Sequence, residues 1–439
     1  MSCIEVKKVL NQLPVAELEE SMATFLEPMM ERLPEERLKR VVPLSVGGIL
    51  GSKSPIVTRM AQAVARDESR VWATAKRLYG FLSNERFDHQ ELNQGLAAIS
   101  RASVEEADPD YAVVVIDPVN FEKPYTEKLE GVSTVLKSTP PDLNGQKRLA
   151  HGYPSMTATV VNTPVPATLY ANWFSYTTAF VSENDEIRKA IVASQQQLPH
   201  YRRRYVLDAG FDDKQWFEQL AQEEFVIRAS QLRRIVEVYN ERLDRWEEER
   251  LGDLVDVVLF SHTFRVTFTH ARRQRLAEVR IGWNAIRLPQ TQQRLWLLVA
   301  YDEDKERTLV LLTNVPLQTI EDVRAVYNDW RLRSRIEHGY RFDQEQGLDV
   351  EDMRVQTLER MRRLFLLVLA AAQFVFYLID TWPAAAVQWI RYLGGKLGLD
   401  NDLDGPYLVL RGLAALFQTV ATLTSASLSP FPHHLFTYG

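Results

Sequence analysis

One apolar run, YAVVVIDPV at residues 111–119, constrains the fold more than any other segment. It is rich in Val and Ile, and it follows a long stretch with helical patterning. Such a run predicts a strand that is buried on both faces, because a strand with one exposed face alternates apolar and polar residues. We therefore expect an α/β fold in which helices flank a sheet.

The elements that follow this strand are expected in a particular order. Two strands, 156–164 and 165–174, meet at the turn signal Asn162-Thr163-Pro164. Ser182 begins a helix, and Asp185 stands at the capping-box spacing, although Glu or Gln is usual there. A strand at 204–211, a short helix at 213–223 and a strand at 224–230 complete the series. Three strands, a helix, a strand, a helix and a strand form the mixed plan of a ribonuclease-H-like core.

The pattern changes again after this core. Residues 236–251 predict a charged helix, and the alternating segments after it predict a β-rich insertion. Helices are expected at 321–342 and 355–379. The resulting division is a helical region at 1–105, a first core part at 106–235, an insertion at 236–314, a second core part at 315–380 and a helical C-terminal region at 381–439.

Composition narrows the class of protein. The single cysteine, Cys3, excludes an intrachain disulfide and disfavours a zinc cluster. The first residues lack the apolar segment of a signal peptide, so a cytoplasmic protein is expected. The run Leu364–Ile379 falls just short of a membrane span and predicts a buried helix, hence no membrane. The net charge of -6 gives no basic footprint for nucleic acid, although basic runs occur locally, as at Arg202-Arg203-Arg204.

Two aspartates end predicted parallel strands. Asp117 closes the first strand and Asp208 closes the fourth, so their carboxylates are expected to converge at one edge of the sheet. Close carboxylates repel each other, and a divalent cation such as Mg²⁺ relieves that repulsion. The alternative is that each Asp is a turn residue or a helix cap. Asp212 and Asp213 follow closely, and they are interpreted as caps of the next helix.

A third acid, Glu337, lies in the segment WRLRSRIEHGYRF. Trp330, Arg333 and Glu337 are spaced by three and four residues, which predicts one helix face, and Arg341 lies one turn further. A carboxylate for a metal beside arginines for a phosphate backbone suits a phosphodiester site. The alternative is an ordinary Glu–Arg surface pair.

Taken together, DPVNF, VLDAGFDD, FVIRAS, LLTNV and WRLRSRIEHGYRF resemble bacterial insertion-sequence transposases of the DDE type. The resemblance covers roughly 110–372 and is most specific to the cut-and-paste group with a β-strand insertion. That group carries the signature Tyr-x2-Arg-x3-Glu-x6-Lys. Arg333 and Glu337 match it, whereas Trp330 replaces the Tyr and Gln344 replaces the Lys. In the family the Tyr, Arg and Lys of this signature hold a DNA phosphate near the cut, and Arg341 would supply the charge that Gln344 lacks.

The resemblance implies a function and a set of partners. Asp117, Asp208 and Glu337 would bind two Mg²⁺ ions, or Mn²⁺, for in-line cleavage and strand transfer. The partners implied are double-stranded DNA (terminal inverted repeats and target DNA) and a second copy in a dimeric synaptic complex, in a bacterial, nucleoid-associated setting. Other DNA contacts expected are Lys76 and Arg77 in the N-terminal helices, and Trp283 and Trp296 in the insertion, where an aromatic ring can stack on a flipped base.

Two other functions stay open at this stage. Gln344 in place of Lys, together with the acidic net charge, favours a catalytically inactive or domesticated DNA-binding relative. A membrane-associated protein built on Leu364–Ile379 is the third possibility.

Overall fold

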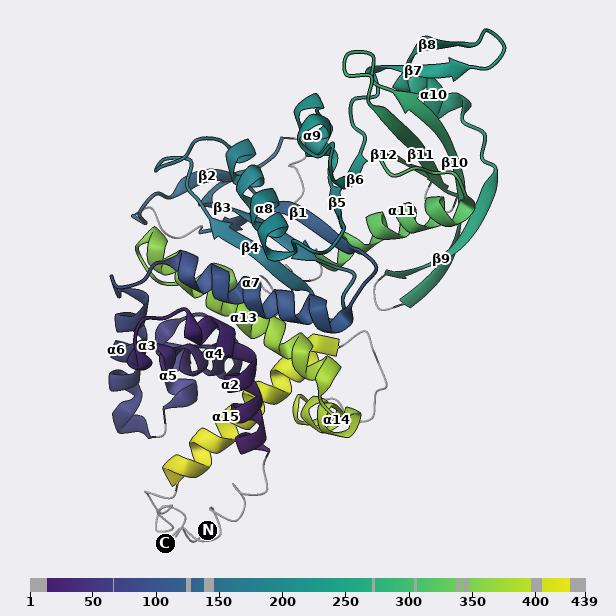
Figure 1. Cartoon of the computed structure of the whole chain (residues 1–439). Helices are drawn as coiled ribbons and strands as arrows, with labels where there is room; N and C mark the ends of the chain where they lie inside the picture. Colours follow the sequence, from purple (N-terminus) through teal and green to yellow (C-terminus); the bar gives the residue numbers. More distant parts are fainter. Residues whose placement is uncertain are drawn as a thin grey trace, which may run out of the picture.

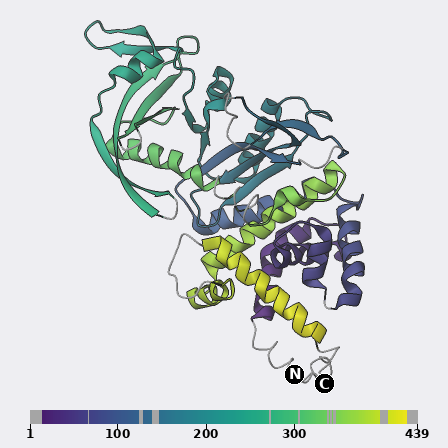
Figure 2. The same cartoon turned by 180° about the vertical axis from the view of Figure 1, so that it is seen from behind.

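The structure is a computed structural model, and it describes residues 14–65, 67–123, 128–137, 146–270, 273–303, 306–336, 339, 342, 347–395 and 405–426. A large mixed sheet runs through the molecule, and helices from both ends of the chain gather on one side of it (Figure 1). The reverse view shows the same two parts, with the sheet above and the helical region below (Figure 2).

The helical region joins the two ends of the sequence. Gly95 of α7 allows α2 and α7 to pack closely, since a Cβ there would lie 2.5 Å from the Cα atom of Met29. The expected helical character of 1–105 is confirmed over its described residues. The helices are α2 (Val15–Glu31), α3 (Glu36–Lys39), α4 (Val41–Ser52), α5 (Val57–Val64), η1 (Glu68–Arg70), α6 (Val71–Leu82), α7 (His89–Ala107), α13 (Leu358–Thr381), α14 (Ala384–Leu393) and α15 (Gly405–Ala426).

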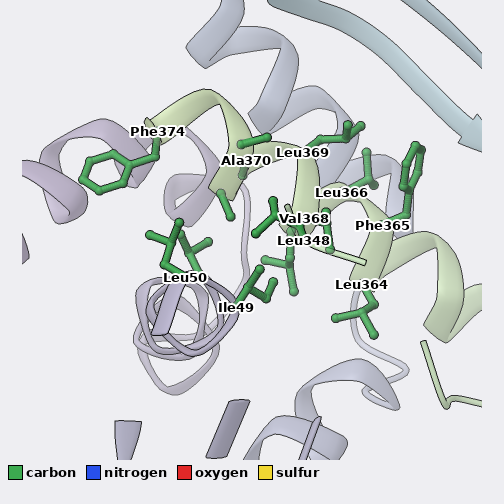
Figure 3. Packing of buried hydrophobic residues seen from close by; sticks show 14 of the residues in the cluster. Ile49, Leu50, Leu348, Leu364, Phe365, Leu366, Val368, Leu369, Ala370 and Phe374 are labelled. Atoms are coloured by element: carbon green, nitrogen blue, oxygen red, sulfur yellow. The ribbon is translucent and has the colours of Figure 1, made fainter. Parts of the chain in front are cut away.

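Helix α13 is the central helix of this region. Figure 3 shows its apolar side chains together with Ile49 and Leu50 of α4 and with Leu348, all members of one buried cluster. α13 has the length and hydropathy of a membrane span, and 72% of that window is buried. The bent pair Glu36–Ser52 and Val57–Val64 passes the same test when taken as one span. The interpretation of Leu364–Ile379 as a buried core helix agrees with this packing.

The first part of the sheet follows the predicted order of elements, with the short strand β2 in addition. β1 pairs in parallel with β5 and β5 with β6, whereas β3 is antiparallel to β1 and to β4. α7 packs on β4, and α8 packs on β3 and β4. The elements are β1 (Ala112–Glu122), β2 (Ser133–Leu136), β3 (Leu149–Val160), β4 (Ala167–Trp173), α8 (Glu183–Gln197), β5 (Arg203–Leu207), η2 (Ala209–Phe211), α9 (Lys214–Gln219) and β6 (Glu224–Arg228).

The insertion is β-rich, as predicted, and its strands form a second part of the sheet that is hydrogen-bonded to the first. β12 pairs with β6, so a single sheet runs in the order β2-β3-β1-β5-β6-β12-β11-β10-β7-β8, with β4 beside β3 and β9 beside β10. The insertion therefore extends the core sheet. Its elements are β7 (Ile235–Asn240), β8 (Arg245–Arg250), α10 (Leu251–Val257), β9 (His262–His270), β10 (Arg273–Arg287), β11 (Arg294–Asp302) and β12 (Arg307–Thr313).

The helix predicted at 236–251 is wrong, because the segment forms the hairpin β7–β8. Tyr239 lies opposite Trp246, and their rings meet edge to face with centroids 5.5 Å apart. Asn240 accepts hydrogen bonds from two backbone amides of the turn, and Asp244 takes a left-handed conformation there. The hairpin lies at the sheet edge with most side chains exposed, so its sequence lacks the apolar alternation of a half-buried strand.

Helix α11 (Ile320–Leu332) contacts β5 through Asp329 and β9 through Arg331. A capping box starts it, with Thr319 and Asp322 each satisfying the other's backbone amide. The predicted helix 321–342 is interrupted, since α11 ends at Leu332, Arg333 forms a turn and residues 334–336 are helical again. The 3-10 turn η3 (Val350–Asp352) precedes α13.

Candidate active site

Strand β1 alternates between two buried cores. Val114 and Ile116 belong to the core that includes α8, whereas Val113 and Val115 belong to the core beneath α11. This double burial is the reason for the continuous apolar run. Because successive side chains point to opposite faces of a sheet, Asp117 lies on the α11 face with Val113 and Val115.

Strand β5 places a second carboxylate beside the first. Tyr205 and Leu207 face the α8 core and Val206 faces the α11 core, so Asp208 also lies on the α11 face. β1 and β5 are parallel, with Val115 opposite Val206. Two residues further along, the same register sets Asp117 opposite Asp208. The predicted convergence of these two aspartates is confirmed.

Arg333 joins the two carboxylates. Its Nη2 atom donates to Asp117 Oδ1 at 3.0 Å and to Asp208 Oδ2 at 3.2 Å. The side chain of Asp117 is 11% exposed and that of Arg333 16%, while that of Asp208 is 37% exposed. One guanidinium thus bridges two acids at a site that opens to solvent on the Asp208 side.

Further groups position this cluster. Asp208 Oδ1 accepts a hydrogen bond from the backbone amide of Ala209 at 2.7 Å, which caps η2. Arg228, on the neighbouring strand β6, brings Nη1 to 3.8 Å from the same carboxylate. The Trp330 ring lies against Arg333, with the guanidinium carbon 5.9 Å from the ring centroid. Trp330 and Arg333 are therefore neighbours, as the signature spacing predicts.

Three predicted site residues, Glu337, Arg341 and Gln344, lie outside the described residues. Their roles stay predictions. Within the described part of the chain, no group of three or more His, Cys, Asp or Glu side chains is placed to hold a metal ion. The structure therefore brings together Asp117, Asp208, Arg333 and Trp330 from the predicted site.

The other predicted DNA contacts lie elsewhere. Lys76 and Arg77 are exposed on α6, where the Lys76 ammonium lies 5.7 Å from the centroid of the Trp72 ring. Trp283 and Trp296 are half-buried against the α11 core, and the Trp283 indole donates to the Leu317 carbonyl oxygen at 3.1 Å. Both rings thus pack in a β layer, and base stacking by either stays a prediction.

Asp212 does not cap α9 as expected. It is buried, pairs with Arg234, and accepts the backbone amides of Ser230 and Gln231, so it fixes the loop after β6. Asp213 does cap α9, accepting from Gln215 N at 3.0 Å. The choice of Asp208 as the site acid is consistent with these separate roles.

A second arginine cluster was not predicted from the sequence. Arg204, at the start of β5, is 5% exposed and pairs with Asp329 of α11 and with Glu224 of β6. The Tyr111 hydroxyl donates to Asp329 at 2.9 Å, and the Tyr111 ring lies beneath Arg204. Burial raises the pKa of Asp329, although Arg204 opposes the shift. This cluster fixes α11 to the sheet one helical turn before Arg333.

Comparison of the chain with known proteins gives only a loose structural likeness. No protein-family model matches it, and no curated protein matches it. One solved structure with some likeness is the cryo-EM structure of a piggyBac transposase synaptic complex with hairpin DNA. It shares 10% sequence identity over 95% of this chain and 81% of that chain, with a TM-score of 0.38. Because a superposition this loose carries no argument, the function rests on the site residues.

Proposed function

We propose that this chain is a DNA transposase that cleaves the strands at transposon ends and transfers them into target DNA by cut-and-paste transposition. One observation carries the proposal: Asp117, on β1, and Asp208, directly after the adjacent parallel strand β5, share Arg333. The order of β4, β3, β1, β5 and β6, with β3 alone antiparallel to its neighbours in the central strands, supports a ribonuclease-H-like core.

The donor set fits a divalent cation. Each of the two carboxylates presents one oxygen to the same cationic atom, Arg333 Nη2. A hard divalent cation prefers such carboxylate oxygens together with water. Asp117 and Asp208 would hold the metal, and Glu337 is proposed as the third ligand. Bound Mg²⁺ or Mn²⁺, two ions in the proposed site, would activate the attacking oxygen and stabilise the leaving one.

The protein's own residues then bind and orient DNA. Among the described residues, Arg333 is the cation that lies within 3.2 Å of both acids, and its planar guanidinium suits a phosphate as well as a carboxylate. Once the acids have another cation, Arg333 is released to hold a phosphate beside them, with Trp330 supporting its side chain. Arg341 and Gln344 would extend this contact, and Lys76 and Arg77 would bind the DNA end. Two ends must meet, so a homodimer is the proposed working form.

A cleavage assay tests the proposal. Labelled duplex carrying the sequences that flank the gene is mixed with purified protein and Mg²⁺ or Mn²⁺. Wild type should cut at the element end, and Asp117→Ala, Asp208→Ala and Glu337→Ala should bind the duplex but cut it at least about a hundredfold more slowly. Asp213→Ala is the matched control, because this exposed aspartate only caps α9, and it should cut at the wild-type rate.

The second candidate is a non-catalytic DNA-binding relative. The Arg333 bridge is the observation that supports this candidate, because an arginine paired with two carboxylates also stabilises a site that binds no metal. Wild-type protein that binds the duplex but never cuts it with either metal would support this candidate and overturn the first.

A further inference from the structure

An open cleft of 920 Å³ lies beside α11, between this helix and strand β9. Its charged lining residues, among those the structure describes, are Arg265, Arg324, Arg331 and Glu278. Arg265 pairs with Glu278 at 3.0 Å, so the charge of the lining as a whole is positive and is concentrated on the α11 wall. In a chain with a net charge of -6, this local surplus is opposite in sign to the whole.

Helix α11 presents different residues on different sides. Arg324, Asn328 and Arg331 are spaced by four and three, so they form one face, and that face lines the cleft. Asp329 and Arg333 lie toward β1 and β5 instead, where they contact the sheet clusters. The helix that delivers Arg333 to the two aspartates therefore also forms the basic wall of the cleft.

The cleft arginines are held by the walls of the cleft. The Arg324 guanidinium lies 4.9 Å from the centroid of the Phe264 ring, and Arg324 is exposed with no carboxylate partner among the described residues. Stacking on a ring leaves the N–H edges of a guanidinium available to another group. Arg331 reaches across to the Thr267 carbonyl oxygen and so ties α11 to β9. No described strand pairs with the outer edge of β9, and backbone amides are a type of donor that binds phosphate oxygens in protein–DNA complexes.

We propose that this cleft between β9 and α11 binds the sugar–phosphate backbone of duplex DNA next to the Asp117–Asp208 site. The proposal rests on the proposed transposase function and names a surface for its substrate. Arg324 and Arg331 are separated along the helix by roughly 10 Å. One DNA strand carries a phosphate about every 3.4 Å along the axis, so this face spans about three phosphates. The occupant is recognised by charge and spacing, and not by base sequence.

The test measures DNA affinity against salt concentration for the double variant Arg324→Ala/Arg331→Ala. The slope of log affinity against log salt should fall by about 0.9 for each phosphate that the protein no longer neutralises, or about two in all. Affinity should fall equally for the gene-flanking duplex and for a duplex of unrelated sequence. Arg324→Lys/Arg331→Lys keeps both charges and should retain most of the wild-type slope. Thermal unfolding of each variant shows that the fold is kept.

The matched control is Arg242→Ala, because Arg242 is an exposed arginine on the β7–β8 turn, at the other end of the β-rich part from β9 (Figure 1). It should leave the slope unchanged. A wild type that binds and cuts DNA, with a double variant of unchanged slope, overturns the cleft proposal alone. A double variant that instead loses self-association assigns the cleft to a second copy of the chain and also overturns it. A wild type that binds no duplex overturns the proposed function as well.

Discussion

Two arginine clusters stand at opposite ends of the same parallel strands, and each joins one guanidinium to two carboxylates. At the start of β5, Arg204 contacts Asp329 and Glu224 and is 5% exposed. At the end of β5, Arg333 bridges Asp117 and Asp208, and the Asp208 side chain is 37% exposed. The buried cluster has an additional hydrogen bond from Tyr111, whereas the other opens to solvent. The Arg204 cluster is therefore a buried structural bridge, whereas the Arg333 cluster is open on one side, as the proposed exchange of Arg333 for a metal ion requires.

The first prediction is that the buried Arg204 cluster contributes more to the free energy of unfolding than the open Arg333 cluster does. Asp329→Ala leaves the buried Arg204 with a single acid, so the free energy of unfolding should fall by about 3 kcal/mol. Asp208→Ala removes a half-exposed partner and should cost less than about 1 kcal/mol. Urea denaturation with the m-value compared between variants measures both. Equal reductions would mean that the Asp117–Asp208 cluster is structural too.

The second prediction concerns the affinity of the Asp117–Asp208 cluster for a divalent cation. Arg333→Gln removes the guanidinium that a metal must displace, so Mn²⁺ should bind without DNA on the order of tenfold more tightly, roughly 1.4 kcal/mol. DNA cleavage should fall in the same variant, because the phosphate loses its arginine. Electron paramagnetic resonance of free Mn²⁺ measures the affinity. Arg228→Gln, whose guanidinium is 3.8 Å from Asp208, is the control and should shift it less. Unchanged or weaker binding by Arg333→Gln would place the metal elsewhere.

The sequence predicts one cluster and not the other for a physical reason. Asp117 and Asp208 come directly after apolar runs that are buried on both faces, so the sequence around each of them is enough to identify it. The prediction that Asp117 closes its strand is wrong, because β1 continues to Glu122, where it pairs with β3. The pairing of Arg204 with Asp329 joins residues far apart in the chain, and nothing near Asp329 distinguishes it from a solvated acid on a helix. Arg228 is similar, since only the pairing of β5 with β6 brings it to Asp208.

The fold shows the same division between local and tertiary information. Long apolar runs and caps predicted β1, α13 and the start of α8 within a few residues. The hairpin β7–β8 was predicted as a helix because its alternating charges suit an exposed helix equally well, and only its cross-strand contacts decide the structure. β2 has four residues and pairs only with the first residues of β3, so its sequence carries too few apolar positions to reveal it.

A third arginine–carboxylate cluster lies in the helical region, and of the three predictions it gives the smallest change in stability. Glu359 accepts hydrogen bonds from His89 and from Arg363, whose guanidinium also donates to backbone carbonyls at the end of α6. Burial opposes ionisation of Glu359, but the contacts with His89 and Arg363 outweigh it and lower its pKa to about 2. A carboxylate with a depressed pKa in the folded state stabilises the protein above the ordinary pKa and loses this contribution as the pH falls.

The window for Glu359 therefore runs from about pH 4.5 down to about pH 2. Glu359→Gln should lower the free energy of unfolding at pH 7 by on the order of 1 kcal/mol, because the side chain is partly solvated and its charge is screened. Below pH 4.5 the variant should lose stability less steeply than wild type, so the two curves converge. Urea unfolding at pH 7, 4.5, 3 and 2.5 checks this. Parallel curves would show that Arg363 keeps its backbone contacts without the carboxylate, and that bridging matters less than burial in this cluster.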